Sequence, residues 1–210
     1  MNILHINSSI RKEGSVSRSL CELTLGMISD IHPAEIEYID LSELPLPPLD
    51  QEFVTALKTT PETLNQEQLI RISWSSRFIS HMKKADLLLF GVPMYNFGVP
   101  SQLKTFFDYT VISGKTFVSD QNGDRGLLDS KKALVISSYG GLYSSTDSES
   151  MNHVAPYLDT ILRFIGIQHI TFVEVQPTLY YGPEEKAKAI SSATEQLKHI
   201  VNNWIPGGLS

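Results

Sequence analysis

The residues of this sequence best suited to chemistry begin directly after its first apolar run, in residues 7–19. Ser9, Ser15 and Ser17 supply hydroxyl donors there, and a helix predicted over residues 17–31 would add free backbone N–H groups at its start. Such donors, together with the positive end of a helix dipole, favour an anion such as a phosphate. The segment therefore predicts a phosphate site, although serine is also common as an ordinary helix cap.

A second candidate segment combines aromatic, thioether and amide groups. It consists of Pro93, Met94, Tyr95, Asn96 and Phe97, directly after a run that is apolar at nearly every position. Flat apolar side chains with one amide suit a planar heterocycle, contacted over its face and hydrogen-bonded at its rim. Taken alone, however, the segment is more simply explained as a turn whose tyrosine and phenylalanine complete the core.

A pair of glycines marks the third candidate segment, which reads Ser138, Tyr139, Gly140 and Gly141 after another apolar run. Glycines let a ligand approach the backbone closely and leave N–H groups unshielded. Glycine pairs occur in many turns, so this segment alone indicates little. Three such segments, each at the end of a predicted inner strand, are far more specific than any one of them.

Short apolar runs alternate with longer amphipathic segments along the sequence, and this alternation predicts the fold. Strands are predicted over residues 2–7, 35–40, 87–92, 133–137 and 170–175, and helices over residues 17–31, 61–84, 100–110, 152–165 and 183–204. This order predicts an α/β fold with a parallel sheet covered by helices on both faces. Five strands suit the doubly wound order 2-1-3-4-5, in which ligands bind beyond the carboxyl ends of the strands.

Five residues are predicted to have structural roles. Thr60 followed by Pro61 is typical of a helix start, and Gly166 stands where a left-handed C-terminal cap is needed. His5, inside the first strand, is expected to be a core histidine with satisfied hydrogen bonds. Cys21 is expected to be a small buried hydrophobic residue.

The composition indicates one ordinary domain over residues 1–210 and excludes several classes of protein. The formal net charge of -6 argues against a partner such as a nucleic acid, and no apolar run approaches the ~18 residues of a membrane span. A single cysteine excludes a disulfide framework and suits the cytoplasm. The histidines lack the spacing of metal ligands, so no metal site is predicted. No G-x-G-x-x-G motif for a tightly held dinucleotide is present.

Together, the motifs resemble those of the FMN-dependent NADH azoreductase (NADH:quinone oxidoreductase) family, whose fold is flavodoxin-like. The similar stretches are Ser-Ser-Ile at 8–10 with Ser-x-Ser at 15–17, Pro-Met-Tyr-Asn-Phe at 93–97, Gln-Leu-Lys at 102–104, Gly-Lys-Thr-Phe at 114–117, Ser-x-Gly-Gly at 138–141, Pro-Tyr-Leu at 156–158, Phe-Ile-Gly at 164–166 and Tyr-Gly-Pro-Glu at 181–184. The resemblance runs from Ile3 to about Gln196, and Pro-Met-Tyr-Asn-Phe is its most specific part.

The resemblance implies one non-covalently bound FMN per chain. Its phosphate would lie on Ser9 and on the stretch Ser15, Val16 and Ser17. Its isoalloxazine would lie against Pro93, Met94, Tyr95, Asn96 and Phe97, with Ser138, Tyr139, Gly140 and Gly141 along the other edge. Phe164 matches an aromatic residue that borders the family's substrate pocket, and because that pocket lies where two subunits meet, a homodimer is implied. The sequence departs from the family at Tyr139, where arginine is frequent, and at Ser119, where some members have an aromatic residue.

Flavin chemistry asks for few acids or bases from the protein, because the cofactor itself accepts a hydride and passes it on. Backbone N–H groups of Gly140 and Gly141 could stabilise negative charge at the pyrimidine edge, and Asn96 could hydrogen-bond the carbonyl rim. We therefore expect two-electron transfer from NADH, favoured over NADPH by resemblance, to quinones, with slower cleavage of azo bonds. Donor and acceptor would use one open flavin face in turn. The alternative is a flavodoxin-like one-electron carrier without turnover of small molecules.

Overall fold

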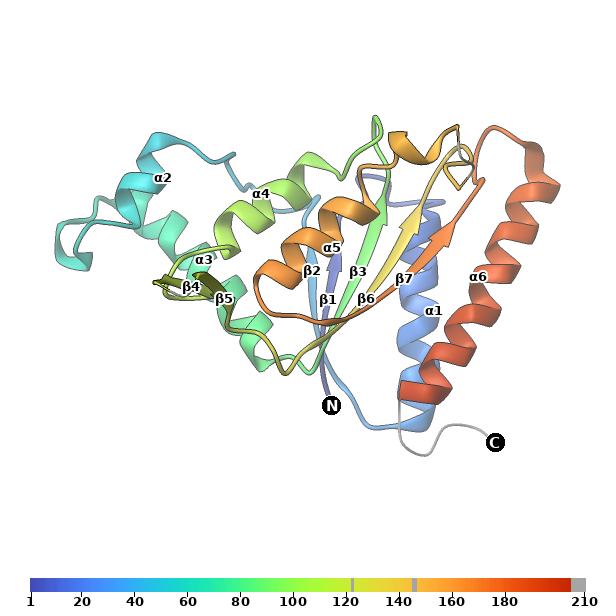
Figure 1. The fold of residues 1–210 in the computed structure, drawn as a ribbon, viewed down its shortest axis with the longest axis horizontal. Helices are drawn as coiled ribbons and strands as arrows, with labels where there is room; N and C mark the ends of the chain where they lie inside the picture. Colours follow the sequence, from blue (N-terminus) through green and yellow to red (C-terminus); the bar gives the residue numbers. More distant parts are fainter. Residues whose placement is uncertain (122, 145–146, 205–210) are drawn as a thin grey trace.

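The structure is a computed structural model, and it describes residues 1–121, 123–144 and 147–204. Its main sheet has five parallel strands in the order β2-β1-β3-β6-β7. Figure 1 shows this order from one edge of the sheet to the other. The strands are β1 (Asn2–Asn7), β2 (Glu35–Asp40), β3 (Leu87–Pro93), β6 (Lys132–Ser138) and β7 (His169–Val175). The predicted doubly wound order 2-1-3-4-5 is confirmed.

The burial of the strands explains why their sequences differ. β3 is buried at every position, and β6 is buried at every position except Lys132, because helices cover both faces of the inner strands. The edge strand β2 is exposed at Glu35, Ile36 and Tyr38. Continuous apolar runs therefore mark the centre of the sheet, and the alternating run marks its edge.

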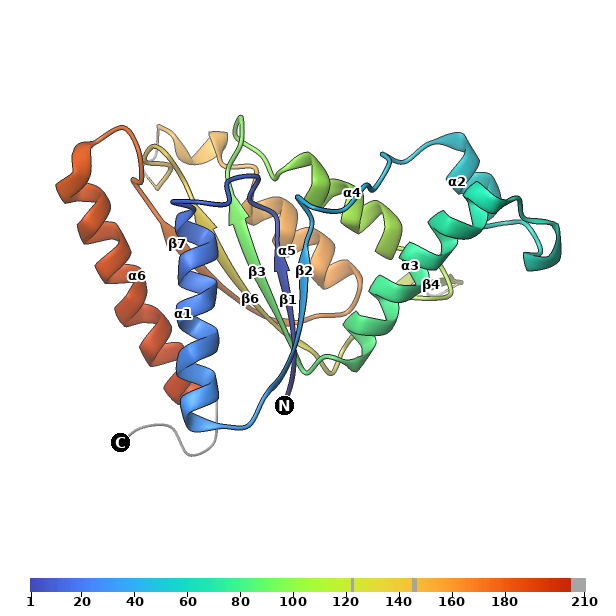
Figure 2. The ribbon, with the colours of Figure 1, turned by 180° about the vertical axis from the view of Figure 1, so that it is seen from behind.

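Helices cover the sheet in two layers (Figures 1 and 2). α1 (Val16–Ile31) and α6 (Gly182–Trp204) pack on one face, where Cys21 and Leu197 join Leu89 in the core. α3 (Gln66–Lys84), α4 (Ser101–Thr110) and α5 (Ala155–Phe164) cover the other face. Cys21 is thus the buried hydrophobic residue that was expected. Within the described ranges, no helix has the length and apolarity that a membrane crossing requires.

The helix predicted over residues 61–84 was wrong at its start. Pro61–Thr63 form only one 3-10 turn, and the α-helix begins at Gln66. The side chain of Asn65 accepts the N–H of Gln68, and the side chain of Gln68 accepts the N–H of Asn65. This reciprocal capping box satisfies the free donors of the helix start, which the Thr60–Pro61 pair does not do.

Two elements outside the main sheet were not predicted. A short helix, α2 (Gln51–Ala56), follows β2, and a hairpin of β4 (Phe117–Asp120) and β5 (Gly123–Gly126) lies between α4 and β6. The hairpin packs against the end of α5, where Gly166 has a φ of +108°. This positive φ confirms the predicted role of Gly166 after the helix.

His5 differs from the expectation that its hydrogen bonds are satisfied. It is buried on β1 beside Tyr38, with ring centroids 4.9 Å apart, and its Nε2 has no hydrogen-bond partner among the described residues. Burial, followed by the positive charge of Arg18, lowers the pKa of His5 from 6.5 to about 4. The imidazole is therefore neutral in the folded protein at pH 7.

Replacing His5 with leucine should flatten the pH dependence of stability between pH 6.5 and 4. In this window the unfolded wild-type chain binds a proton at His5 and the folded chain does not, so wild-type stability falls as the pH falls, by about 3 kcal/mol in total. A buried leucine does not titrate and removes this contribution. Urea unfolding of both proteins at pH 7, 5.5 and 4 checks the expectation. Parallel stability curves for the two proteins would contradict it.

Candidate functional site

A cavity of about 680 Å³ opens where the carboxyl ends of β1, β3 and β6 meet. The predicted site residues that line it are Ser9, Ser15, Val16, Pro93, Met94, Tyr95, Asn96, Phe97, Ser138 and Gly140. The topology brings them together because parallel strands end at the same edge of the sheet. All three candidate segments therefore meet at one site.

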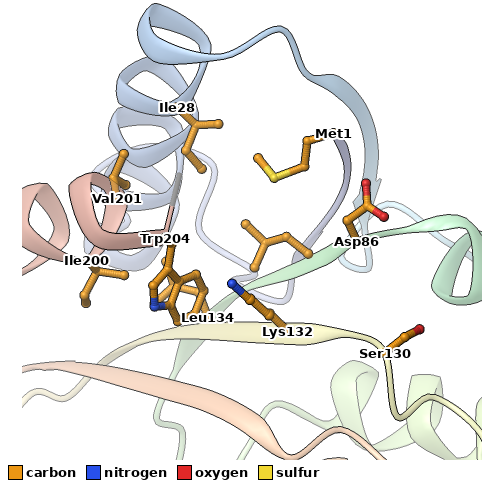
Figure 3. A pocket seen from close by; sticks show the side chains of 10 residues that line it. Met1, Ile28, Asp86, Ser130, Lys132, Leu134, Ile200, Val201 and Trp204 are labelled. Atoms are coloured by element: carbon orange, nitrogen blue, oxygen red, sulfur yellow. The ribbon is translucent and has the colours of Figure 1, made fainter. Parts of the chain in front are cut away.

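A second cavity, of about 190 Å³, lies at the opposite ends of the strands (Figure 3). Leu87 and Leu134 lie at its base, and the ammonium of Lys132 lies 5.4 Å from the ring centroid of Trp204. None of the three candidate segments reaches it. The larger cavity is therefore the candidate functional site.

The loop between β1 and α1 presents donors to this cavity. Ser8 fixes the loop to β3, because its backbone N–H (3.0 Å) and its hydroxyl (2.9 Å) both donate to the carbonyl of Gly91. Ser15 caps α1 by accepting the N–H of Arg18 at 3.4 Å. The N–H groups of Val16 and Ser17, in the first turn, have no partner within the helix. Val16 lines the cavity, so its N–H group is placed to bind an anion there.

A buried ion pair supports this loop from behind. Arg18 Nη1 lies 2.7 Å from Asp40 Oδ2, and Arg18 Nη2 donates to the carbonyl of Ser9 at 3.3 Å. Burial alone would raise the pKa of Asp40, but hydrogen bonds from Arg18, Ser42 and Asn7 outweigh it and lower the pKa to about 2. Asp40 is thus ionised at neutral pH and keeps Arg18 engaged. Arg18 positions Ser9 rather than facing the cavity itself.

The aromatic segment forms a tight turn above β3. Tyr95 and Gly98 exchange two backbone hydrogen bonds, of 3.0 and 3.1 Å. Between them Asn96 and Phe97 have φ angles of +48° and +70°, a left-handed conformation that is strained for a phenylalanine. Phe97 is 46% exposed. This side chain lies on the cavity and does not complete the core, so the simpler explanation of the segment as a core-filling turn fails for it.

Hydrogen bonds join the three loops into one unit. The N–H of Ile10 donates to the hydroxyl of Tyr95 at 3.3 Å, and the N–H of Met94 donates to the carbonyl of Ser138 at 2.9 Å. In the third loop, the carbonyl of Gly140 accepts the N–H groups of Leu179 and Tyr180, both at 3.1 Å. A Cβ on Gly140 would lie 3.0 Å from the Tyr180 ring, so glycine permits this close packing.

Four of the predicted site residues do not line the cavity: Ser17, Tyr139, Gly141 and Phe164. Ser17 is buried, with its Oγ 3.4 Å from the Oγ of Ser15. The side chain of Tyr139 is buried in the core. Phe164 lies at the other end of α5, about 15 Å along a helix of 10 residues, where its ring centroid is 4.7 Å from that of Phe117. Ser119 is on the hairpin, with its hydroxyl against Asp124.

The structure adds residues that the motifs did not single out. The loop after β7 and the first turn of α6 contribute Thr178, Leu179, Tyr180 and Lys186, and Tyr143 comes from the loop after Gly141. One signal could have indicated the first four: β7 is also a strand of the parallel sheet, so its carboxyl end opens at the same edge. The predicted site was confined to the loops after the strands over residues 2–7, 87–92 and 133–137, so this loop was not expected to contribute.

The charge of the cavity suits an anion. Among the described residues that line it, Arg11 and Lys186 are cations and none is a carboxylate, although the chain has a formal net charge of -6. The donors at Ser9, Ser15 and Val16 fit a phosphate, and the flat segment from Pro93 to Phe97 fits a ring system. The lining therefore fits FMN, whose phosphate and planar ring these two groups of residues would hold.

Comparisons with known proteins match this arrangement. A family model described as a flavodoxin-like fold matches residues 1–201. An FMN-dependent NADH:quinone oxidoreductase of Nostoc sp. is 38% identical over 206 residues, covering 97% of this chain and 99% of that protein. One of Hydrogenovibrio crunogenus is 37% identical over 204 residues, covering 97% and 98%. An FMN-dependent NADH-azoreductase of Bacillus anthracis, solved in complex with FMN, superposes with a TM-score of 0.85 at 26% identity and covers 96% of this chain and 100% of that one.

Proposed function

This chain belongs to the protein family whose model is described as a flavodoxin-like fold, and we propose that it is an FMN-dependent NADH:quinone oxidoreductase. It transfers two electrons from NADH to quinones and also cleaves azo bonds reductively. The observation that carries this proposal is the single cavity in which phosphate donors, a flat aromatic turn and a glycine turn meet. Among the described residues that line the cavity, one group of phosphate donors stands at the start of α1 and no second group is present for an adenylate half, which favours FMN over FAD.

Different residues of the cavity would bind different parts of FMN. Ser9, Ser15 and the N–H group of Val16 would hold the phosphate, and residues 93–97 would support one face of the ring. Asn96 and the backbone of Gly140 would bind the polar rim. When bound, FMN supplies the redox chemistry, because it accepts a hydride and passes it on.

Because one face of the flavin ring would rest on the protein, the two substrates are expected to bind in a fixed order. Residues 93–97 would cover that face, which would leave the opposite face to NADH and the quinone in turn. The oxidised nicotinamide would then leave before the acceptor enters, and ping-pong kinetics are expected. Among the described lining residues there is no aspartate, glutamate, histidine or cysteine to act as an acid or base. Acceptors that are easily reduced, such as quinones, should therefore turn over faster than azo dyes.

Stopped-flow spectroscopy tests the proposed reaction. NADH should bleach the flavin absorbance of the purified protein in one step, and a quinone should restore it in one step without any added reductase. Steady-state rates at several fixed quinone concentrations should give parallel double-reciprocal lines. No bleaching by NADH, or electron transfer only in the presence of a separate reductase, would contradict the enzyme and favour the one-electron carrier.

A homodimer is part of the proposal. Phe164 does not line the cavity of its own chain, so its predicted place at a substrate pocket calls for a second subunit whose pocket it would border. The rim of the cavity is also apolar and open, with Leu179 63% and Tyr180 75% exposed. An exposed apolar rim of this kind is typical of an interaction surface. Light scattering should give twice the mass of the chain.

The proposal also covers the extent of the domain, the location of the protein and its partners. Residues 1–210 are proposed to act as one FMN-binding domain, since the family model extends over residues 1–201. A cytoplasmic location is proposed because the one cysteine, Cys21, is a buried free thiol, as suits a reducing compartment. No partner other than small molecules and a second copy of the chain is proposed.

A further inference from the structure

A buried tyrosine below the cavity has two polar partners. Tyr139 is fully buried, and its hydroxyl lies 3.0 Å from Ser137 Oγ and 3.0 Å from Glu174 Oε1. A carboxylate only accepts hydrogen bonds, so the phenol donates its one proton to Glu174 and accepts from Ser137. Burial raises the pKa of the Tyr139 phenol, which keeps this proton in place. The phenol therefore stays protonated at neutral pH and can donate to Glu174.

Glu174 is the centre of a wider network. Besides Tyr139, it accepts the side-chain amides of Asn152 at 3.4 Å and of Gln176 at 3.3 Å. Across the part of the chain that the structure describes, no cation lies within 4.0 Å of its carboxylate. Three neutral donors thus fix its orientation. Since a partly satisfied buried network is costly, loss of one member should disturb the others.

The network reaches the cavity through Gln176 and Tyr143. Gln176 Oε1 accepts the backbone N–H of Tyr143 at 2.6 Å. Tyr143 lines the cavity, and its ring packs edge-on against Tyr139, with centroids 5.9 Å apart, and against Phe97, with centroids 6.2 Å apart. A continuous path of contacts therefore leads from the Tyr139 hydroxyl to an aromatic wall of the site.

We propose that Tyr139 and Glu174 are positioning residues that hold Tyr143 against Phe97 and thereby set the affinity of the site for planar acceptors. The inference rests on the proposed function, since it assumes that quinones enter this cavity. The sequence departs from the family at Tyr139, and the structure gives that departure a role. A phenol donates one directional hydrogen bond to Glu174 without adding a charge of its own, and at the same time its ring packs against Tyr143.

The substitution Tyr139→Phe tests the proposal, because it removes the hydroxyl and keeps the ring. The purified protein is titrated with anthraquinone-2-sulfonate without NADH, and the dissociation constant is read from the flavin absorbance and from tyrosine fluorescence. We expect binding to weaken at least about fivefold, while FMN affinity changes less than about twofold. The KM for this quinone should rise with little change in kcat, because the variant loses binding of the acceptor and no reacting group.

Tyr109→Phe is the matched control. Tyr109 is also fully buried, but its hydroxyl has no hydrogen-bond partner among the described residues, and it lies on α4 away from the cavity. This control should leave quinone binding unchanged. If Tyr139→Phe does not fold, Glu174→Gln replaces it and should also weaken quinone binding at constant FMN affinity, since an amide NH2 group in place of Oε2 cannot accept the hydrogen bond that Gln176 donates there.

Two results would overturn the proposal: quinone binding that is unchanged in the variant, or FMN and quinone binding that weaken in parallel. The second result would show general loosening of the protein and no specific effect on the acceptor wall. The binding experiment needs no turnover, so it separates this inference from the proposed function. A wild-type protein that binds the quinone and is never bleached by NADH would contradict the function alone.

Discussion

Removing the hydroxyls of Ser9 and Ser15 together should weaken FMN binding by about two to four decades. Both side chains line the cavity next to the first turn of α1, where a phosphate would lie. Each hydrogen bond to a charged group contributes about 1.5–3 kcal/mol, and about 1.4 kcal/mol corresponds to a factor of ten. The best pair of substitutions is Ser9→Ala with Ser15→Gly, because glycine in place of a serine cap destabilises a helix by only a few tenths of a kcal/mol.

Fluorescence titration of the apoprotein with FMN measures this effect. Ser8→Ala is the matched control, because Ser8 lies in the same loop but donates its hydroxyl to the carbonyl of Gly91 at 2.9 Å. It should lower stability slightly and leave FMN affinity unchanged. An affinity of the double variant within about threefold of wild type, against the decades expected from the lost hydrogen bonds, would move the phosphate to another part of the cavity.

The substitution Gly126→Ala should destabilise the fold by at least about 3 kcal/mol. A Cβ on Gly126 would lie 2.0 Å from the backbone nitrogen of Gly166 and 2.2 Å from the carbonyl carbon of Ile165. These are backbone atoms on a turn that is itself held by a hydrogen bond from the N–H of Leu128 to the carbonyl of Ile165, at 2.9 Å. The backbone at Gly126 and the backbone at residues 165–166 can move apart only if the β4–β5 hairpin detaches from α5.

The free energies of unfolding of this variant and of the control Gly26→Ala are measured by urea unfolding. Gly26 lies in α1 with no atom within 4 Å of an added Cβ, so alanine there should stabilise the protein by up to about 1 kcal/mol through helix propensity. The two glycine-to-alanine substitutions are therefore expected to have opposite signs. A loss smaller than about 1 kcal/mol for Gly126→Ala, the lower end of the usual overpacking effect, would show that the hairpin does not pack closely on α5.

The local sequence pattern predicted the fold because the burial of each strand or helix determines where its apolar residues stand. The inner strands β3 and β6 read as apolar runs since both their faces are covered, and β2 alternates since it is at an edge. Helix starts were less predictable, because several capping combinations compete. Asn65 with Gln68 forms the cap that begins α3, and only the hydrogen bonds in the structure distinguish this pair from Thr60 and Pro61.

The sequence by itself determined where the candidate site lies. Ser9, Asn96 and Gly140 stand at the carboxyl ends of inner parallel strands, and chain order alone brings those ends to one edge of the sheet. Only the tertiary structure decided which side chains face the cavity. Tyr139 turns into the core because Glu174 accepts its hydroxyl, and Lys186 reaches the cavity from a helix that begins after the edge strand. Such directions depend on contacts between residues far apart in the chain, which no local pattern contains.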